Sequence, residues 1–314
     1  MPETAESSPE FPPVSVIMTV RNEMEHLGGC LQSVLDQEYA GDVEVVIAVG
    51  PSSDGTEDFA AGLPGQDQRI TVVPNPSGRT PDGLNIALAH AKHGLIARID
   101  GHNLIEGTDY LSTAVRVLRE TDAVNVGGVA RPEGSTATQK AIGIAMSSPL
   151  GMGGASFRVG GDAGPAETVF PGLFQRDWID RVGGWDPTLD RAQDWELNQR
   201  LRNAGGVVWF TPELRTIYRP RGSMRALARQ FHSTGQWRRR LAEEDTSALN
   251  VRYLAPPAAV LAIAAGTAGA LWWRPAALVP AIYGAAVTVG GIAISEGSRC
   301  RCAFACRRLW RPCT

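Results

Sequence analysis

The amino-acid sequence predicts an α/β fold with a mixed, mainly parallel sheet and flanking helices, followed by a hairpin of two transmembrane helices. Three features support this prediction. Short β-branched apolar runs alternate with segments of helical apolar spacing, polar residues follow the apolar runs, and two long uncharged stretches lie near the C-terminus.

Two strands and a helix open the predicted sheet. Val14–Val20 and Val43–Val49 are apolar runs rich in valine, as is typical of parallel strands buried on both faces. Residues 25–37 carry one apolar stripe on an otherwise polar segment, which predicts a helix. The same alternation then predicts a strand, a helix and a strand over residues 70–73, 82–93 and 95–99.

The composition is typical of a folded, slightly acidic protein. Of the 314 residues, 43% are hydrophobic, which supplies a sizeable core and excludes a disordered scaffold. Because 30 Lys and Arg stand against 33 Asp and Glu, bulk electrostatic binding of nucleic acid is not expected. Cys30 is the only cysteine before position 300, and residues 1–13 lack a secretory pattern, so we expect the bulk of the chain to be cytosolic.

Polar segments at the ends of three predicted strands form the candidate site. They are residues 21–23, 50–56 and 100–102. Ligands of α/β sheets bind beyond the carboxyl ends of the strands, so these segments should line one crevice. The chain has neither a Gly-x-Gly-x-x-Gly fingerprint after its first strand nor a phosphate-binding P-loop, which argues against hydride transfer and P-loop hydrolysis.

Two long apolar stretches predict the membrane hairpin. Residues 254–273 and 275–295 are each long enough to cross a hydrocarbon core of roughly 30 Å. Arginines precede the first stretch and follow the second, so the positive-inside rule places both flanks in the cytoplasm, with Trp272 and Trp273 at the far interface. The alternative is a pair of buried alanine-rich helices in a soluble bundle.

The predicted organisation has five parts. They are a disordered tail (1–13), the α/β domain (14–237), a basic juxtamembrane segment (238–253), two transmembrane helices (254–295) and a basic, cysteine-rich cytoplasmic tail (296–314). The spacing of the tail cysteines lacks the paired knuckles of structural zinc sites, so reduced or acylated thiols beside a membrane are the preferred interpretation.

Asp100 and His102 directly follow a predicted strand. A carboxylate and an imidazole two residues apart can both face one divalent cation, which would stabilise a diphosphate leaving group. The alternative is a turn-capping aspartate beside a surface histidine.

Asp194 and Glu196 lie near the start of a predicted helix that ends about residue 203. Acidic residues in a first helical turn complement the helix dipole, so capping is the alternative to a chemical role, and for Glu196 the two interpretations stay open. Just upstream, Gly183 and Gly184 predict a tight turn that lets the backbone approach a ligand closely.

Several ordered motifs together resemble the family 2 glycosyltransferases of the GT-A fold. The motifs are VSVIMTVRNE, SSDGT and GGWDPTLDRAQDWELNQRLRNAG. Further motifs are similar to the bacterial succinoglycan-biosynthesis, ExoA-like branch of that family: IARIDGHN, ETVFPGLFQRD, QDWELNQRLR, YRPRGS and QFHSTGQWR. The resemblance covers about residues 14–238.

The resemblance implies inverting transfer of a sugar from a nucleotide-diphosphate donor to an acceptor hydroxyl. In this sequence Asp194 matches the family's catalytic base, and Asp100 with His102 matches its motif for a divalent cation, Mn²⁺ or Mg²⁺. The donor-binding positions implied are Thr19, Arg21, Glu23, Asp54, Arg79 and Asp100. The acceptor or diphosphate positions implied are Trp185, Gln230, Gln236 and Trp237.

Two of these assignments have alternatives from the residues themselves. Asp54 precedes Gly55 and suits an Asx-type turn. Val49 occupies the position at which family members commonly carry the aspartate that recognises uracil, so the resemblance leaves the base of the donor open. Trp237 suits an anchor at the membrane interface as well as an acceptor site.

The combined prediction is a membrane-anchored, multi-pass glycosyltransferase whose catalytic domain faces the cytoplasm. Its expected acceptor is a lipid-linked saccharide, because tethering a catalytic domain to the bilayer raises its effective concentration near such substrates. The alternatives are a sugar-nucleotide-binding protein without transferase activity and a nucleotidyltransferase. A nucleotidyltransferase would require a glycine-rich phosphate loop after the first strand, and the sequence has none there.

Overall fold

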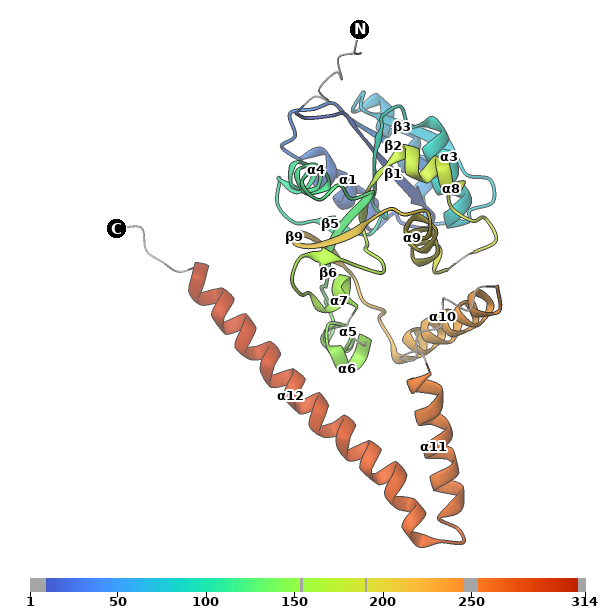
Figure 1. The fold of residues 1–314 in the computed structure, drawn as a ribbon. Helices are drawn as coiled ribbons and strands as arrows, with labels where there is room; N and C mark the ends of the chain where they lie inside the picture. The colour runs from blue at the N-terminus through green and yellow to red at the C-terminus, as the bar shows by residue number, and fades with distance from the viewer. Residues whose placement is uncertain (1–9, 153–154, 190, 245–253, 310–314) are drawn as a thin grey trace.

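One mixed sheet of nine strands organises the part of the chain that the structure describes (Figure 1). The structure, a computed structural model, describes residues 10–152, 155–189, 191–244 and 254–309. The strands are β1 (Val14–Val20), β2 (Val43–Val49), β3 (Ile70–Pro74), β4 (Leu95–Arg98), β5 (Leu104–Ile105), β6 (Asn125–Pro132), β7 (Gly164–Pro165), β8 (Gly172–Gln175) and β9 (Val208–Tyr218).

Helices cover both faces of this sheet (Figure 1). The helices of the α/β domain are α1 (Leu27–Leu35), α2 (Thr56–Ala61), α3 (Thr80–His90), α4 (Tyr110–Thr121), α5 (Ala137–Met146), α6 (Pro149–Met152), α7 (Ser156–Val159), α8 (Arg176–Val182) and α9 (Gln193–Asn203), with a short 3₁₀ turn at Leu63–Gly65. After them come α10 (Met224–Glu244), α11 (Ala255–Gly269), a 3₁₀ turn at Arg274–Ala277 and α12 (Leu278–Leu309).

The strand order is β3-β2-β1-β4-β8-β6-β9-β5, and β7 pairs with β9. Strands β1 to β4 run parallel, β8 is antiparallel to both neighbours, and β6 and β9 are parallel to each other. The predicted strands are therefore confirmed in the parallel half, and the predicted helices over 25–37 and 82–93 are α1 and α3, each with slightly different ends.

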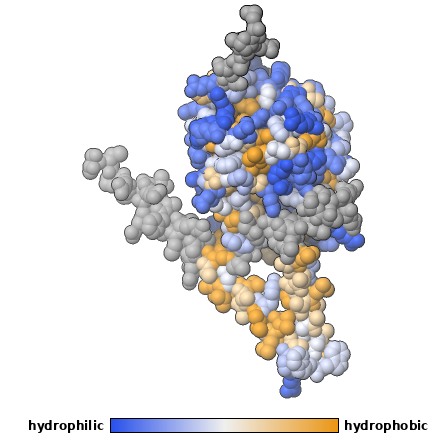
Figure 2. All heavy atoms as spheres, viewed as in Figure 1, coloured by the Kyte–Doolittle hydropathy of each residue, from blue (hydrophilic) through white to orange (hydrophobic). Residues whose placement is uncertain are grey.

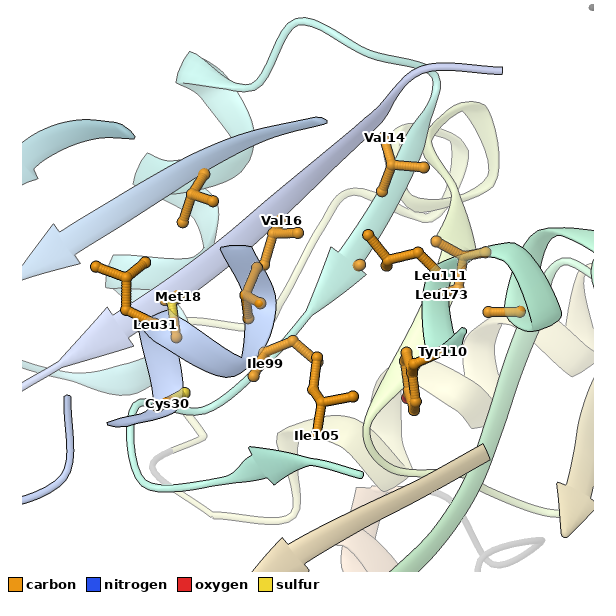
Figure 3. Packing of buried hydrophobic residues seen from close by; sticks show 14 of the residues in the cluster. Val14, Val16, Met18, Cys30, Leu31, Ile99, Ile105, Tyr110, Leu111 and Leu173 are labelled. Carbon is orange, nitrogen blue, oxygen red and sulfur yellow. The ribbon is translucent and has the colours of Figure 1, made fainter. Parts of the chain in front are cut away.

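The two faces of β1 explain why the sheet is buried on both sides. Val14, Val16 and Met18 alternate along the strand and pack against α1 and α4, as Figure 3 shows with Leu31 and Leu111. Ile17 points to the opposite face, whose buried cluster is formed with residues of α3, α8 and α9. Helices on both faces fix the carboxyl ends of the strands, where the candidate site lies.

The N-terminal boundary differs from the prediction. Residues 1–9 of the predicted disordered tail lie outside the described residues, but residues 10–13 contact the domain. The ring of Phe11 packs edge to face against Tyr39 with 6.0 Å between centroids, and the carbonyl oxygen of Glu10 accepts a hydrogen bond from Arg119. These contacts attach the segment before β1 to the domain.

The C-terminal helices α11 and α12 extend away from the domain as a V (Figure 1), and their described residues are largely hydrophobic on the surface in Figure 2. Residues Arg274–Ile294 form one helical stretch of 21 residues that is long and apolar enough to cross a membrane. Helix α11 has 15 residues, about 22 Å at 1.5 Å per residue, which is shorter than a roughly 30 Å hydrocarbon core. The predicted pair of full-length spans is thus supported for the second stretch only, and residues 245–253 and 310–314 of the flanking predicted segments lie outside the described residues.

Candidate active site

The candidate site lies where the strand order reverses. Strands β2 and β3 extend the sheet to one side of β1, whereas β4 lies on its other side. Such a reversal opens a crevice between the loops that follow the two neighbouring strands. Here these loops begin at Arg21, after β1, and at Ile99, after β4.

The loops after β1 and β2 pack closely beside this crevice. Arg21 Nε donates a hydrogen bond to the carbonyl oxygen of Pro51 at 3.2 Å. A Cβ atom at Gly50 would lie 2.8 Å from the Cα of Gly78, so this close approach of two loops requires glycine. The backbone therefore fixes Arg21 at the rim of the crevice.

The Asp54 carboxylate stabilises one of these loops. Its oxygens accept hydrogen bonds from the Thr56 hydroxyl at 2.6 Å, from the Thr56 amide at 3.0 Å and from the Met24 amide at 3.1 Å. The hydrogen bond from the Thr56 hydroxyl, together with these amides, holds the pKa of Asp54 below its ordinary value. This is the geometry of the Asx-type turn, and it joins the loop after β2 to the loop after β1.

The Asp100-Gly101-His102 segment closes the other side of the crevice. A Cβ atom at Gly101 would lie 2.6 Å from Val20 Cγ1, so glycine lets this loop approach the end of β1. His102 Nδ1 donates a hydrogen bond to Glu23 Oε1 at 3.0 Å, which leaves Nε2 as the nitrogen that can accept. Glu23, predicted to bind the donor, and His102, predicted to bind the cation, are thus in direct contact.

His102 has a perturbed acidity. Burial alone would lower its pKa, but the hydrogen bond to Glu23 and the negative charges of Asp100 and Glu23 outweigh burial. The pKa of His102 is therefore raised above the ordinary histidine value, although the charge of Arg221 opposes protonation. Arg221 is thus close enough to belong to the electrostatic surroundings of this loop.

Arg98 joins the two predicted catalytic carboxylates. Its side chain is 2% exposed, its Nη2 donates to Asp100 Oδ1 at 3.0 Å, and its Nη1 contacts Asp194 Oδ1. The carbon at the centre of its guanidinium lies 5.2 Å from the centroid of the Phe170 ring. This Arg98 bridge, Asp100–Arg98–Asp194, places the predicted metal and base carboxylates in one site.

Arg98 was not among the residues predicted from the sequence. The signal for it is a charged residue inside the apolar strand LIAR, two positions before Asp100 and therefore on the same face of the chain.

Helix α9 presents Asp194 in its first turn. Ala192 precedes the helix with φ of 63°, a left-handed conformation that is rare for residues other than glycine. Glu196, in the same first turn, forms a charged contact with Arg200, whose Nη2 donates to the carbonyl oxygen of Gly184 at 2.8 Å. Through Arg200, Glu196 therefore stabilises the upstream glycine turn, whereas Asp194 lies in the crevice.

The remaining donor-side residues surround the start of α3. A Cβ atom added to Gly83 of α3 would first meet the Thr19 hydroxyl. Thr19 therefore faces α3 from the end of β1. Arg79 is the residue immediately before α3, and its carbonyl oxygen accepts a hydrogen bond from Asn75 Nδ2 at 3.0 Å. Both residues lie at the carboxyl edge of the sheet.

Trp185 lies in the core, which differs from its predicted place in the acceptor site. Its side chain is fully buried, and its ring packs edge to face against Phe174 with 6.0 Å between centroids. Its backbone exchanges two hydrogen bonds with Asn85 of α3, at 2.7 and 2.9 Å. The glycine turn before Trp185 therefore approaches α3, and the indole contributes to the core packing next to the site.

The loop after β9 carries basic side chains to the crevice. Arg219 contacts the His26 ring, and Arg221 Nε donates to Gln230 Oε1 at 2.9 Å. Gln230 of α10 thus reaches the site through Arg221. Gln236 is exposed on the same helix, and Trp237 is half-buried.

The residues at the crevice offer a small set of ligands for a divalent cation. Among the residues that the structure describes, no three His, Cys, Asp or Glu side chains gather as a metal-binding group. Asp100 and His102 supply one carboxylate and one imidazole, and Mn²⁺ and Mg²⁺ commonly take their other ligands from substrate phosphates and water. The donor set therefore fits an ion that binds together with a nucleotide diphosphate.

Comparisons with known proteins identify relatives of this chain. Residues 15–182 match the family model described as glycosyl transferase family 2. The chain is 30% identical, over 90% of its length and 86% of the relative, to the succinoglycan biosynthesis protein ExoA of Rhizobium meliloti (strain 1021). A Methanococcus voltae protein is 23% identical over 71% of both chains; its name is dolichyl N-acetyl-alpha-D-glucosaminyl phosphate 3-beta-D-2,3-diacetamido-2,3-dideoxy-beta-D-glucuronosyltransferase.

Solved structures share the fold. The mannosyltransferase PcManGT from Pyrobaculum calidifontis, in complex with GDP-Man and Mn²⁺, superposes with a TM-score of 0.66 at 21% identity, covering 95% of this chain and 87% of that one. A fragment of S. aureus TarS bound to UDP-GlcNAc gives a TM-score of 0.52 at 14% identity over 67% of this chain and 59% of that one. The sheet and its helices are thus those of the GT-A fold. With the family match and the similarity to ExoA, these findings show that the chain is a family 2 glycosyltransferase of the ExoA-like branch.

Proposed function

We propose that the protein transfers a sugar, with inversion, from a nucleotide-diphosphate donor to a hydroxyl of a lipid-linked saccharide at the cytoplasmic face of a membrane. The observation that carries this proposal is the Arg98 bridge, which joins the predicted metal carboxylate, Asp100, to the predicted base, Asp194. A displacement reaction needs a leaving-group site and a proton acceptor that share one sugar, and this bridge brings the two carboxylates together.

Asp194 acts as the proton acceptor in this proposal. An ionised carboxylate takes the proton from the acceptor hydroxyl as the oxygen attacks the anomeric carbon. Attack from the face opposite the departing diphosphate inverts the configuration at that carbon. Arg98 acts by position: its buried guanidinium holds the Asp194 carboxylate at a fixed place, and Phe170 packs against that guanidinium.

The donor side is formed by the loops after β1 and β4. Asp100 and His102 would hold a divalent cation, and Glu23 orients the His102 ring so that its Nε2 is available. A cation at these residues would neutralise charge on the departing diphosphate. Arg21, at the rim, and Arg221, beside His102, add positive charge toward the same phosphates.

The acceptor side of the proposal rests on the apolar helices and on one relative. Large hydrophobic side chains of α11 and α12 are exposed; they include Val260, Leu261, Leu278, Ile282, Val287 and Ile292. Exposed apolar helices of this kind suit a lipid environment. The name of the Methanococcus voltae relative includes a dolichyl-linked sugar phosphate, which supports a lipid-linked acceptor here.

A panel of nucleotide sugars tests the proposed function. The full-length chain in detergent is incubated with GDP-mannose, UDP-glucose or UDP-N-acetylglucosamine, with Mn²⁺ or with EDTA, and nucleoside diphosphate release and thermal stability are measured. We expect one donor to raise the melting temperature in a cation-dependent way and to be turned over. Stabilisation by a donor without release of nucleoside diphosphate, in the presence of membrane lipid extract as acceptor source, would favour a binding protein instead.

A further inference from the structure

The domain contains a second arginine, half-buried, whose charge, unlike that of Arg98, meets no carboxylate among the described residues. Arg98 contacts Asp100 and Asp194, which compensate its charge. Arg158, in the short helix α7, forms no ion pair within the described part of the chain, and its Nε and Nη1 are buried without a hydrogen-bond partner there. Buried N–H groups without acceptors are unfavourable, so the position of these two Arg158 nitrogens needs a physical reason.

Aromatic rings hold the Arg158 side chain in place. Its guanidinium carbon lies 4.0 Å from the centroid of the Tyr218 ring and 5.3 Å from that of Phe157. Burial lowers the pKa of Arg158, and the nearby Tyr218 hydroxyl only partly opposes this effect. The rings stabilise the cation through their faces, but they cannot satisfy N–H groups that lie away from them. The Nε–H and Nη1–H groups of Arg158 therefore remain as donors for a ligand that carries oxygen acceptors.

The surroundings of Arg158 connect it to both the active site and the apolar helices. Tyr218 ends β9 and directly precedes the loop that carries Arg219 and Arg221, the basic residues of the crevice. The Tyr218 hydroxyl contacts Met146 Sδ of α5 at 3.8 Å, and α5 in turn contacts α12. In Figure 1, α5 and α7 lie on the side of the sheet that faces the V of α11 and α12.

We propose that Arg158, held against Tyr218, forms a subsite for the phosphate group of the lipid-linked acceptor. This inference rests on the proposed function and names the part of the acceptor that the protein recognises. A phosphate group supplies oxygen acceptors and negative charge to the unpaired guanidinium donors, and charge-assisted hydrogen bonds of this kind are strong. Arg158 packs on Tyr218, which contacts Met146 of α5, and α5 contacts the apolar helix α12, so the surroundings of Arg158 favour a phosphate attached to lipid over a free one.

Binding of farnesyl phosphate to the full-length chain in detergent tests the subsite. Titrations compare farnesyl phosphate with farnesol and with inorganic phosphate, using the wild type, Arg158→Met and Arg158→Lys. Arg181→Met is the matched control, because Arg181 also stacks on an aromatic ring, 4.4 Å from the Trp178 centroid, but is exposed on α8. We expect Arg158→Met to weaken farnesyl phosphate binding at least tenfold, Arg158→Lys to weaken it less, and Arg181→Met to leave it unchanged.

A stability measurement separates a ligand site from a structural role. If a bound phosphate normally compensates the charge of Arg158, that charge is uncompensated in the ligand-free protein, and Arg158→Met removes it. The ligand-free variant should then melt at the same temperature as the wild type or higher. A melting temperature several degrees lower would overturn the proposal in favour of a structural arginine. Equal farnesyl phosphate affinity in the wild type and in Arg158→Met would also overturn it, as would an effect of the variant on inorganic phosphate alone. Failure of the wild type to release nucleoside diphosphate from any donor would instead refute the proposed function, independently of the binding result.

Discussion

Replacing Arg98 with methionine should destabilise the domain and separate Asp100 and Asp194, the carboxylates proposed to bind the cation and to accept the proton. Removing one partner of a fully buried ion pair costs about 3–5 kcal/mol, because a charge is left buried without compensation. Here Arg98 is 2% exposed, whereas the side chains of Asp100 and Asp194 are 21% and 23% exposed, so water can solvate them in part. We therefore expect a loss of about 3 kcal/mol, near the lower end of that range.

Thermal unfolding of the detergent-solubilised chain measures this effect. For a domain of this size, about 3 kcal/mol corresponds to a melting temperature lower by roughly 6–12 °C. The double variant Arg98→Met/Asp194→Asn should lose less than the sum of the two single variants, since removing one carboxylate charge relieves the unpaired site. Arg181→Met, an exposed arginine on α8, serves as the control and should stay close to the wild type. A melting temperature of Arg98→Met within about 2 °C of the wild type would correspond to less than about 1 kcal/mol. If the double variant is also additive, the Arg98 bridge does not contribute to stability, which refutes this reasoning.

Two further predictions concern the metal site and the acid stability of the sheet. His102→Ala should weaken Mn²⁺-dependent donor binding at least tenfold, measured by titrating Mn²⁺ at fixed donor, whereas the exposed control His90→Ala should not; equal titrations would make His102 a turn residue only. Burial of Glu44 acts to raise its pKa, but hydrogen bonds from the Ser15 hydroxyl and the Lys92 amide, with nearby positive charge, outweigh burial and lower it. The stability that ionised Glu44 provides is therefore present at neutral pH and lost as the pH falls below the ordinary value of 4.5 toward the lowered pKa. Glu44→Gln should accordingly be less stable than the wild type at pH 7, with a difference that shrinks below about pH 4, and a difference independent of pH would contradict this assignment.

The sequence was most informative where the physical signal is local. The valine-rich runs of β1 and β2 identify strands buried on both faces, and the polar residues after β1 and β4 identify the edge at which the site lies. Chain order alone could not reveal that β8, β6 and β9 extend the sheet with antiparallel and parallel pairs, because their pairing depends on contacts between distant segments.

The residues that were missed or misplaced act through long-range contacts. Arg98 meets Asp194 from a segment 96 positions away, and no spacing rule predicts such a pair. Trp185 lies beside a glycine turn that resembles a ligand-binding loop, but the turn packs against Asn85 of α3 and buries the indole in the core. Arg158 gives no signal in sequence, because the lack of acceptors for its Nε and Nη1 among the described residues is visible only once its neighbours in space are known.

The Asp194→Asn variant tests the central claim most directly. Asparagine keeps the shape of the side chain but cannot accept the proton from the attacking hydroxyl, so donor binding should persist while transfer stops. The measurement is a single-turnover assay of labelled sugar transfer to membrane lipid, with donor affinity determined on the same preparation. We predict a loss of at least a hundredfold in the transfer rate with an unchanged donor dissociation constant. Transfer by Asp194→Asn at the wild-type rate would contradict the assignment of the base and, with it, the mechanism built on the Arg98 bridge.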